Sequence, residues 1–105
     1  MKNHPIPQLG AATALVQLLE EHPELPTAHW SVGKVVPVLG GHLHDCGMDA
    51  LDAYASALGG SIRAGQDYMA DGEMRRNHVL TSVWRDVRVS ILLSLPAPVT
   101  SAVSA

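Results

Sequence analysis

The most regular alternation of apolar and polar residues lies near the C-terminal end of the chain, between residues 78 and 95. The segment HVLTSVWRDVRVSILLSL contains two runs in which apolar, often β-branched side chains recur at every second position. This period of two is typical of β-strands that bury one face. A polar break at Arg85-Asp86 separates the runs and predicts a hairpin, and it leaves the turn type open because neither residue is Gly or Asn.

The first half of the chain predicts a helix, two strands and a second helix. Apolar residues recur every three or four positions from about residue 9 to 21, and Pro23 ends this helix. Alternation over 27–32 and 35–39 predicts two strands, joined at Gly33-Lys34, with Leu43 as an alternative end of the second strand. Because Pro37 lacks an N–H, the second strand is expected at an edge or broken there. Residues 40–47 then form a loop in this prediction.

The second predicted helix covers residues 48–58, with Asp45 as its N-cap and Gly59-Gly60 at its end. A weaker alternation over 61–69 predicts a further strand. Asp71-Gly72 suits a type I′ hairpin turn, after which a polar segment leads into the strands of residues 78–95.

This order of elements, α-β-β-α-β-β-β, predicts an α+β fold. We expect an antiparallel sheet of four or five strands with two helices packed on one face. The chain divides into an extended N-terminal lead-in (1–8), a single α+β domain (9–95) and a flexible C-terminal tail (96–105). A chain of 105 residues is long enough for one modest core.

Composition and charge narrow the class of protein. A hydrophobic content of 47% with 16% charged residues argues against disorder, and a net charge of −3 gives no overall attraction to nucleic acid or anionic membranes. The single cysteine, Cys46, excludes an internal disulfide and fits a reducing compartment. No apolar run approaches the roughly 20 residues of a spanning helix. The N-terminus also lacks a signal-peptide pattern, so we expect a cytoplasmic protein without membrane contact.

A short segment offers possible metal ligands, because His42, His44 and Cys46 would point the same way in an extended chain. Two imidazoles and a thiolate suit Zn²⁺, and His29 or His78 could supply a fourth ligand. The alternative is that these are ordinary loop residues before the second helix, in which case no cofactor is expected. Neither a phosphate-binding glycine motif nor a catalytic constellation is recognisable, which disfavours an enzyme.

Four arginines in the last strands, Arg75, Arg76, Arg85 and Arg88, could form a basic strip. Interleaved with Trp84 and Tyr68, such a strip would suit stacking on bases and contact with phosphates, which indicates possible nucleic-acid binding. Because acidic residues lie beside these arginines in sequence, the alternative is a solvated polar face.

The pattern of the last two strands also predicts apolar residues on both faces. We assign Leu80, Trp84 and Leu92 to a second face that two helices on the first face would leave uncovered. Exposure of these side chains predicts a homodimer, formed through the final hairpin or the edge of the sheet. The favoured function is therefore a non-enzymatic interaction or regulatory module that acts through protein–protein contacts.

Four segments resemble a type of small uncharacterised protein found in actinomycetes such as Streptomyces. They are LLEEHPELP at the end of the first helix, HWSV in the first strand, the helix DALDAYASALGG and the late hairpin VWRDVRV. The resemblance extends over roughly residues 9–95. It implies a similar α+β layout and no particular activity.

Overall fold

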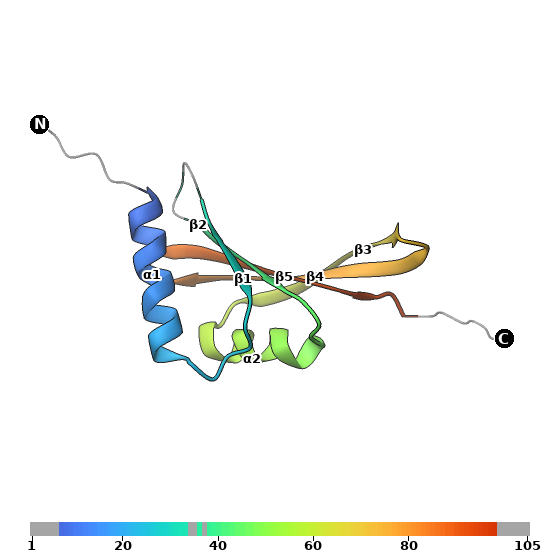
Figure 1. Ribbon diagram of the computed structural model, residues 1–105, viewed down its shortest axis with the longest axis horizontal. Helices are drawn as coiled ribbons and strands as arrows, with labels where there is room; N and C mark the ends of the chain where they lie inside the picture. Colours follow the sequence, from blue (N-terminus) through green and yellow to red (C-terminus); the bar gives the residue numbers. More distant parts are fainter. Residues whose placement is uncertain (1–6, 34–35, 37, 99–105) are drawn as a thin grey trace, which may run out of the picture.

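The computed structural model describes residues 7–33, 36 and 38–98. The predicted order of two helices and five strands is confirmed (Figure 1). Most of the predicted lead-in and C-terminal tail lies outside the described residues, as do Lys34, Val35 and Pro37. The elements are α1 (Pro7–Glu21), β1 (His29–Val32), β2 (Val38–Leu43), α2 (Met48–Leu58), β3 (Ser61–Ala70), β4 (Glu73–Trp84) and β5 (Val87–Pro96).

The five strands form one sheet in the order β1-β2-β5-β4-β3. All neighbouring strands are antiparallel except β2 and β5, which are parallel, so the expectation of a purely antiparallel sheet is wrong. The physical reason is that α2 returns the chain to the end of the sheet where β2 began. The strand β3 therefore runs in the same direction as β2, and so does β5 after the two hairpins.

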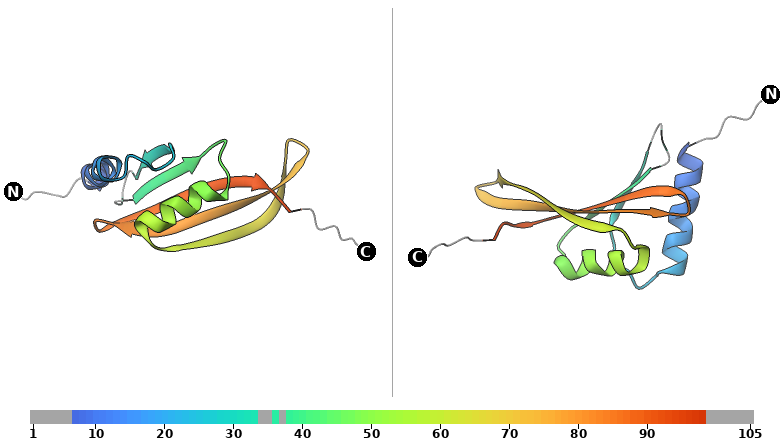
Figure 2. Two further views of the ribbon diagram at one scale, coloured as in Figure 1. Left: turned by 90° about the horizontal axis from the view of Figure 1, so that it is seen from below. Right: turned by 180° about the vertical axis from the view of Figure 1, so that it is seen from behind.

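Both helices pack on one face of the sheet, as predicted. Figure 2 shows α2 lying along the sheet and α1 crossing one end of it. The buried side chains of β2, β4 and β5 fall on alternate positions, which is the pattern of a sheet with one covered face. The core consists of Ala11, Ala14, Leu39, Leu43, Ala50, Leu51, Tyr54, Leu80, Val87, Val89, Ile91 and Leu93. We call the opposite side of the sheet the open face.

Two tight hairpins connect the last three strands. At Asp71-Gly72 the φ angles are 52° and 77°, and at Arg85-Asp86 they are 53° and 66°. Positive φ at both central residues is typical of type I′, which confirms the Asp-Gly prediction. Arg85 holds this conformation through tertiary contacts, because its guanidinium lies 4.6 Å from the centre of the Trp84 ring and donates to Glu21 on α1.

The strand β2 continues through Gly40 and Gly41, which the sequence analysis placed in a loop. Gly41 is required because the ring of Trp30 on β1 lies across it. A Cβ atom at this position would stand 3.0 Å from the Trp30 ring and 3.3 Å from Ile91. Gly41 therefore lets an aromatic side chain pack against the sheet where a larger residue would displace it.

The N-terminal end of α2 differs from the sequence prediction, whereas its C-terminal end at Gly59 agrees with it. Gly47 occupies the N-cap position without a side-chain hydrogen bond, so the assignment of Asp45 as the cap is wrong. The chain turns at Asp45 in the left-handed region (φ 56°), two residues before the cap position. At the other end, the buried Ser82 donates from its hydroxyl to the carbonyl of Leu58 at 3.0 Å, which satisfies one free carbonyl of the helix.

Candidate interaction surfaces

The outer half of the β3–β4 hairpin projects beyond both helices (Figures 1 and 2). We call residues 67–76 the hairpin arm. Met69 and Met74 are paired across its two strands and are 63% and 47% exposed. Exposed methionines on a projecting element are unusual for a solvated hairpin and typical of adaptable contact surfaces. The sequence analysis did not select them, although they flank the Asp71-Gly72 turn.

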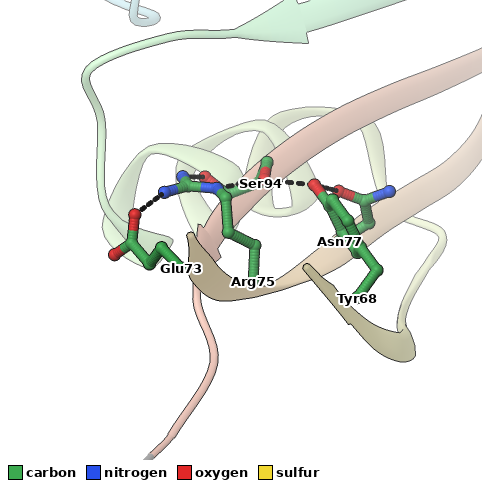
Figure 3. Close-up of polar contacts among 5 residues, drawn as sticks. All are labelled: Tyr68, Glu73, Arg75, Asn77 and Ser94. Atoms are coloured by element: carbon green, nitrogen blue, oxygen red, sulfur yellow. Dashed lines mark hydrogen bonds and ion pairs between the residues drawn. The ribbon is translucent and has the colours of Figure 1, made fainter. Parts of the chain in front are cut away.

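A polar network on the open face ties β3, β4 and β5 together at the base of the hairpin arm (Figure 3). The hydroxyl of Tyr68 donates to Asn77 Oδ1 at 2.9 Å and lies 2.7 Å from Ser94 Oγ. Arg75 donates from Nε to Ser94 Oγ at 2.9 Å and from a terminal nitrogen to the Ser94 carbonyl at 2.8 Å. Glu73 completes the network by accepting from Arg75 at 3.0 Å.

On the other side of the hairpin arm, a bidentate ion pair joins β3 to β4. Arg76 donates to both carboxylate oxygens of Asp67, at 2.6 and 3.3 Å. This hydrogen bonding, together with the positive charge, holds the pKa of Asp67 below its usual value, and the same contact raises the pKa of Arg76. Polar cross-links on both faces therefore order a hairpin that the apolar core does not reach.

Within the part of the chain that the structure describes, β3 forms one edge of the sheet and pairs only with β4. All of its residues are exposed except Ile62 and Ala70, which are half-buried. A bulge between Ala64 and Asp67 inserts one extra residue, so the side-chain alternation changes phase there.

The change of phase sets which side chains of β3 share a face. Before the bulge, Ile62 packs toward the core and Arg63 lies on the open face. After the bulge, Tyr68 lies on the open face and Met69 on the helix-covered side, since their partners on β4 are Arg75 and Met74.

The structure does not bring the predicted interface residues Leu80, Trp84 and Leu92 to one surface. Leu80 is completely buried opposite Ile91, and Trp84 lies on the same face opposite Val87. Leu92 alone lies on the open face, where it is half-buried. The reason is the two-residue turn, because it pairs even positions of β4 with odd positions of β5, whereas the sequence analysis grouped even positions together.

Trp84 also has partners from α1. Its ring nitrogen donates to the carbonyl of Ala14 at 2.9 Å, and His22 meets its ring edge-on at 5.7 Å between ring centres. These contacts fasten α1 to the end of the last hairpin. Trp84 is therefore a core-anchoring residue in the described fold and not part of a free second face.

The four arginines of the predicted basic strip do not form one surface. Arg75 and Arg88 lie on the open face, Arg76 lies on the other side, and Arg85 occupies the turn against α1. Three of the four have an acidic partner. These ion pairs are Arg75 with Glu73 at 3.0 Å, Arg76 with Asp67 at 2.6 Å and Arg85 with Glu21 at 2.5 Å. They neutralise most of the charge that phosphate binding would use.

Histidines from β1 and β2 gather at the opposite edge of the sheet. His29 is the direct cross-strand partner of His42, and the ring of His44 stacks on His42 at 4.5 Å and meets His29 edge-on at 4.9 Å. The thiol of Cys46 is engaged with the main chain, because it donates to the backbone carbonyl of His44 at 3.0 Å. The sequence analysis named His29 only as a possible extra ligand, because strand register cannot be read from spacing.

A mainly apolar hollow of about 380 Å³ lies between the end of α1, the following loop and β1. Leu18, Leu25, Trp30 and Tyr54 form much of its wall. The Tyr54 hydroxyl donates to the carbonyl of Pro26 and so links α2 to the loop. Burial of the phenol, with a smaller contribution from the charge of Cys46, raises the pKa of Tyr54.

Neither helix in the described part of the chain is long and apolar enough to cross a bilayer. Comparison of the chain with protein-family models, with curated proteins and with solved structures found no match. Function is therefore inferred from the surfaces described above.

Proposed function

We propose that the protein is a non-enzymatic interaction module that acts through protein–protein contacts, and that the partner at β3 is a second copy of the same chain. The observation that carries this proposal is the exposed edge of β3, which continues into the hairpin arm with its exposed Met69. An unpaired strand edge offers main-chain donors and acceptors to another strand. A second copy is the partner that always presents the same edge, and two-fold pairing is the commonest arrangement of homo-oligomers.

The phase change at the bulge favours an antiparallel register in which the segment before the bulge in one copy pairs with the segment after the bulge in the other. Residues on the same face must stand opposite each other, so Ser61–Ala64 of one copy pairs with Asp67–Ala70 of the other. This register places Ile62 against Met69 on the helix-covered side. It places Arg63 against the ring of Tyr68 on the open face, where a cation–π contact forms. The two bulges then face each other at the two-fold axis.

The rigidity of the hairpin arm supports this pairing. Figure 3 shows Tyr68 already fixed by Asn77 and Ser94, and Arg76 fixes Asp67 on the other side. Ordering a strand edge before association lowers the entropy cost of binding. Each cross-strand pair contributes only about 0.2–1 kcal/mol, so we expect a weak dimer that forms in the micromolar range. Nucleic-acid binding is a less favoured alternative, because acids already pair three of the four predicted arginines.

Light scattering over a concentration series tests the proposal. A dimer has a mass of 22.2 kDa, which is twice the 11.1 kDa of one chain. Met69→Lys should shift the population to monomer, because it removes the contact with Ile62 of the second copy. Met74→Lys is the matched control, since Met74 is also exposed on the hairpin arm and lies on the inner strand β4.

Two results would overturn the proposal. One is a single-chain mass for the unaltered protein throughout the series, up to several hundred micromolar, well above the concentration range of even a weak specific interface. The other is equal disruption by Met69→Lys and Met74→Lys, which would move the contact from the strand edge to the tip of the hairpin. Circular dichroism of both variants verifies that the fold is retained.

A further inference from the structure

Three histidines at the β1–β2 edge form a cluster that the proposed dimer does not use, because β1 and β3 are the two opposite edges of the sheet. His29 and His42 stand directly opposite each other on antiparallel strands. Side chains in this relation have Cβ atoms about 4.5–5.5 Å apart. His44 follows β2 two residues after His42, and its ring contacts the rings of both.

We infer that His29, His42 and His44 form a binding site for Zn²⁺. The distances between their rings fit one shared ion. A Zn–N bond is about 2.0–2.1 Å long, so two imidazoles on one tetrahedral zinc have ring centres about 5 Å apart. The observed centre-to-centre distances are 4.9 Å for His29 with His44 and 4.5 Å for His42 with His44.

The rings are not yet arranged around a common point. Among the described residues, no three His, Cys, Asp or Glu side chains stand as a ready-formed metal site. The planes of His42 and His44 are only 23° from parallel, so these two rings meet through their faces. Turning their nitrogens toward one ion needs rotation about side-chain bonds, and the χ2 torsion of histidine is broad. His44 is exposed and His42 is only half-buried, so neither ring is enclosed by the core.

The ligand set differs from the one suggested by the spacing of His42, His44 and Cys46. The thiol of Cys46 donates to the backbone carbonyl of His44 and borders a separate hollow beside Asp49 and Ala53. Neutral imidazoles are suitable ligands for zinc and other late first-row metals, and three of them leave a fourth position for water. The site therefore needs no thiolate.

Calorimetric titration of the tag-free protein with zinc chloride tests this inference. At about pH 7.5 we expect one equivalent of Zn²⁺ to bind. His29→Ala, His42→Ala and His44→Ala should each weaken binding by about tenfold or more, because each removes one of three ligands. Two matched controls, His78→Ala and Cys46→Ser, should leave the affinity unchanged, since His78 lies on β4 and the Cys46 thiol donates to a backbone carbonyl.

X-ray absorption on the unaltered protein loaded with one equivalent of zinc gives a test that does not depend on the folding of variants. We expect nitrogen or oxygen neighbours at about 2.0–2.1 Å with the multiple-scattering features of imidazole. A sulfur neighbour at about 2.3 Å would overturn the assignment. Absence of saturable binding, or binding that His29→Ala leaves unchanged, would overturn it as well.

Discussion

Substitution of Tyr54 by Phe removes a single hydroxyl from a buried junction between α2 and the loop before β1. Tyr54 is 1% exposed, and its hydroxyl donates to the carbonyl of Pro26. This hydrogen bond joins α2 to the loop between α1 and β1, which are distant in sequence. Phenylalanine keeps the ring and its edge-on contact with Trp30, so the variant isolates the contribution of the hydroxyl.

The expected loss of stability follows from the burial of the two partners. A net contribution of about 0.5–1.5 kcal/mol is usual for an intramolecular hydrogen bond. Pro26 is half-buried, so water can partly replace the lost donor, and we expect about 1 kcal/mol. For a domain of this size, that loss lowers the melting temperature by about 4–8 °C.

The raised pKa of Tyr54 adds a pH dependence. Above about pH 10 an unfolded tyrosine loses its proton while the buried phenol in the folded protein still holds its own. The unfolded state then binds fewer protons, so stability falls as the pH rises above 10. Tyr54→Phe should show a smaller decrease in this range, because it lacks the titrating group.

Urea denaturation followed by circular dichroism measures both effects, with Tyr68→Phe as the matched control. Tyr68 is 36% exposed, and water can take over its contacts with Asn77 and Ser94. We therefore expect its loss to change the free energy of unfolding by no more than about 0.5 kcal/mol. A cost for Tyr68→Phe equal to that for Tyr54→Phe would refute the reasoning from burial.

Two further predictions concern the sheet. Gly41→Ala should reduce stability by about 1–3 kcal/mol, because the new Cβ atom would press on the Trp30 ring. Gly10→Ala in α1 is the control and should be neutral or stabilising, since nothing lies within 4 Å of its added Cβ atom. Chemical denaturation of the two variants compares them directly, and equal losses would contradict the packing account. The lowered pKa of Asp67 makes its ion pair with Arg76 favourable above about pH 4 and lost as the pH falls further. Asp67→Asn should therefore weaken the acid dependence of stability measured between about pH 5 and 2, and an unchanged acid profile would count against the ion pair.

Local patterns in the sequence predicted the elements of the fold well. The alternation over residues 78–95 indicated β4 and β5, and Asp71-Gly72 indicated their neighbouring hairpin. These features depend on side chains that are near one another in the chain. The same reasoning failed at Asp45, because the helix begins two residues later with Gly47 as its N-cap. It failed also at Gly40-Gly41, where contacts with β1 require glycine.

Longer-range relations were beyond the sequence because they depend on strand register and direction. The parallel pairing of β2 with β5 follows from the path of α2, which no local pattern encodes. The number of residues in the Arg85-Asp86 turn decides which face of the sheet Leu80 and Trp84 share with residues of β5. The approach of His29 to His44 likewise follows from the register of β1 on β2.

A nuclear Overhauser measurement on a mixed sample tests the proposed dimer most directly. One half of the chains carries labelled isoleucine methyl groups and the other half carries labelled methionine methyl groups, so that only contacts between copies are detected. The proposed register predicts a cross-peak between Ile62 of one copy and Met69 of the other at concentrations where light scattering gives a dimer. A dimer that lacks this cross-peak would contradict pairing through β3.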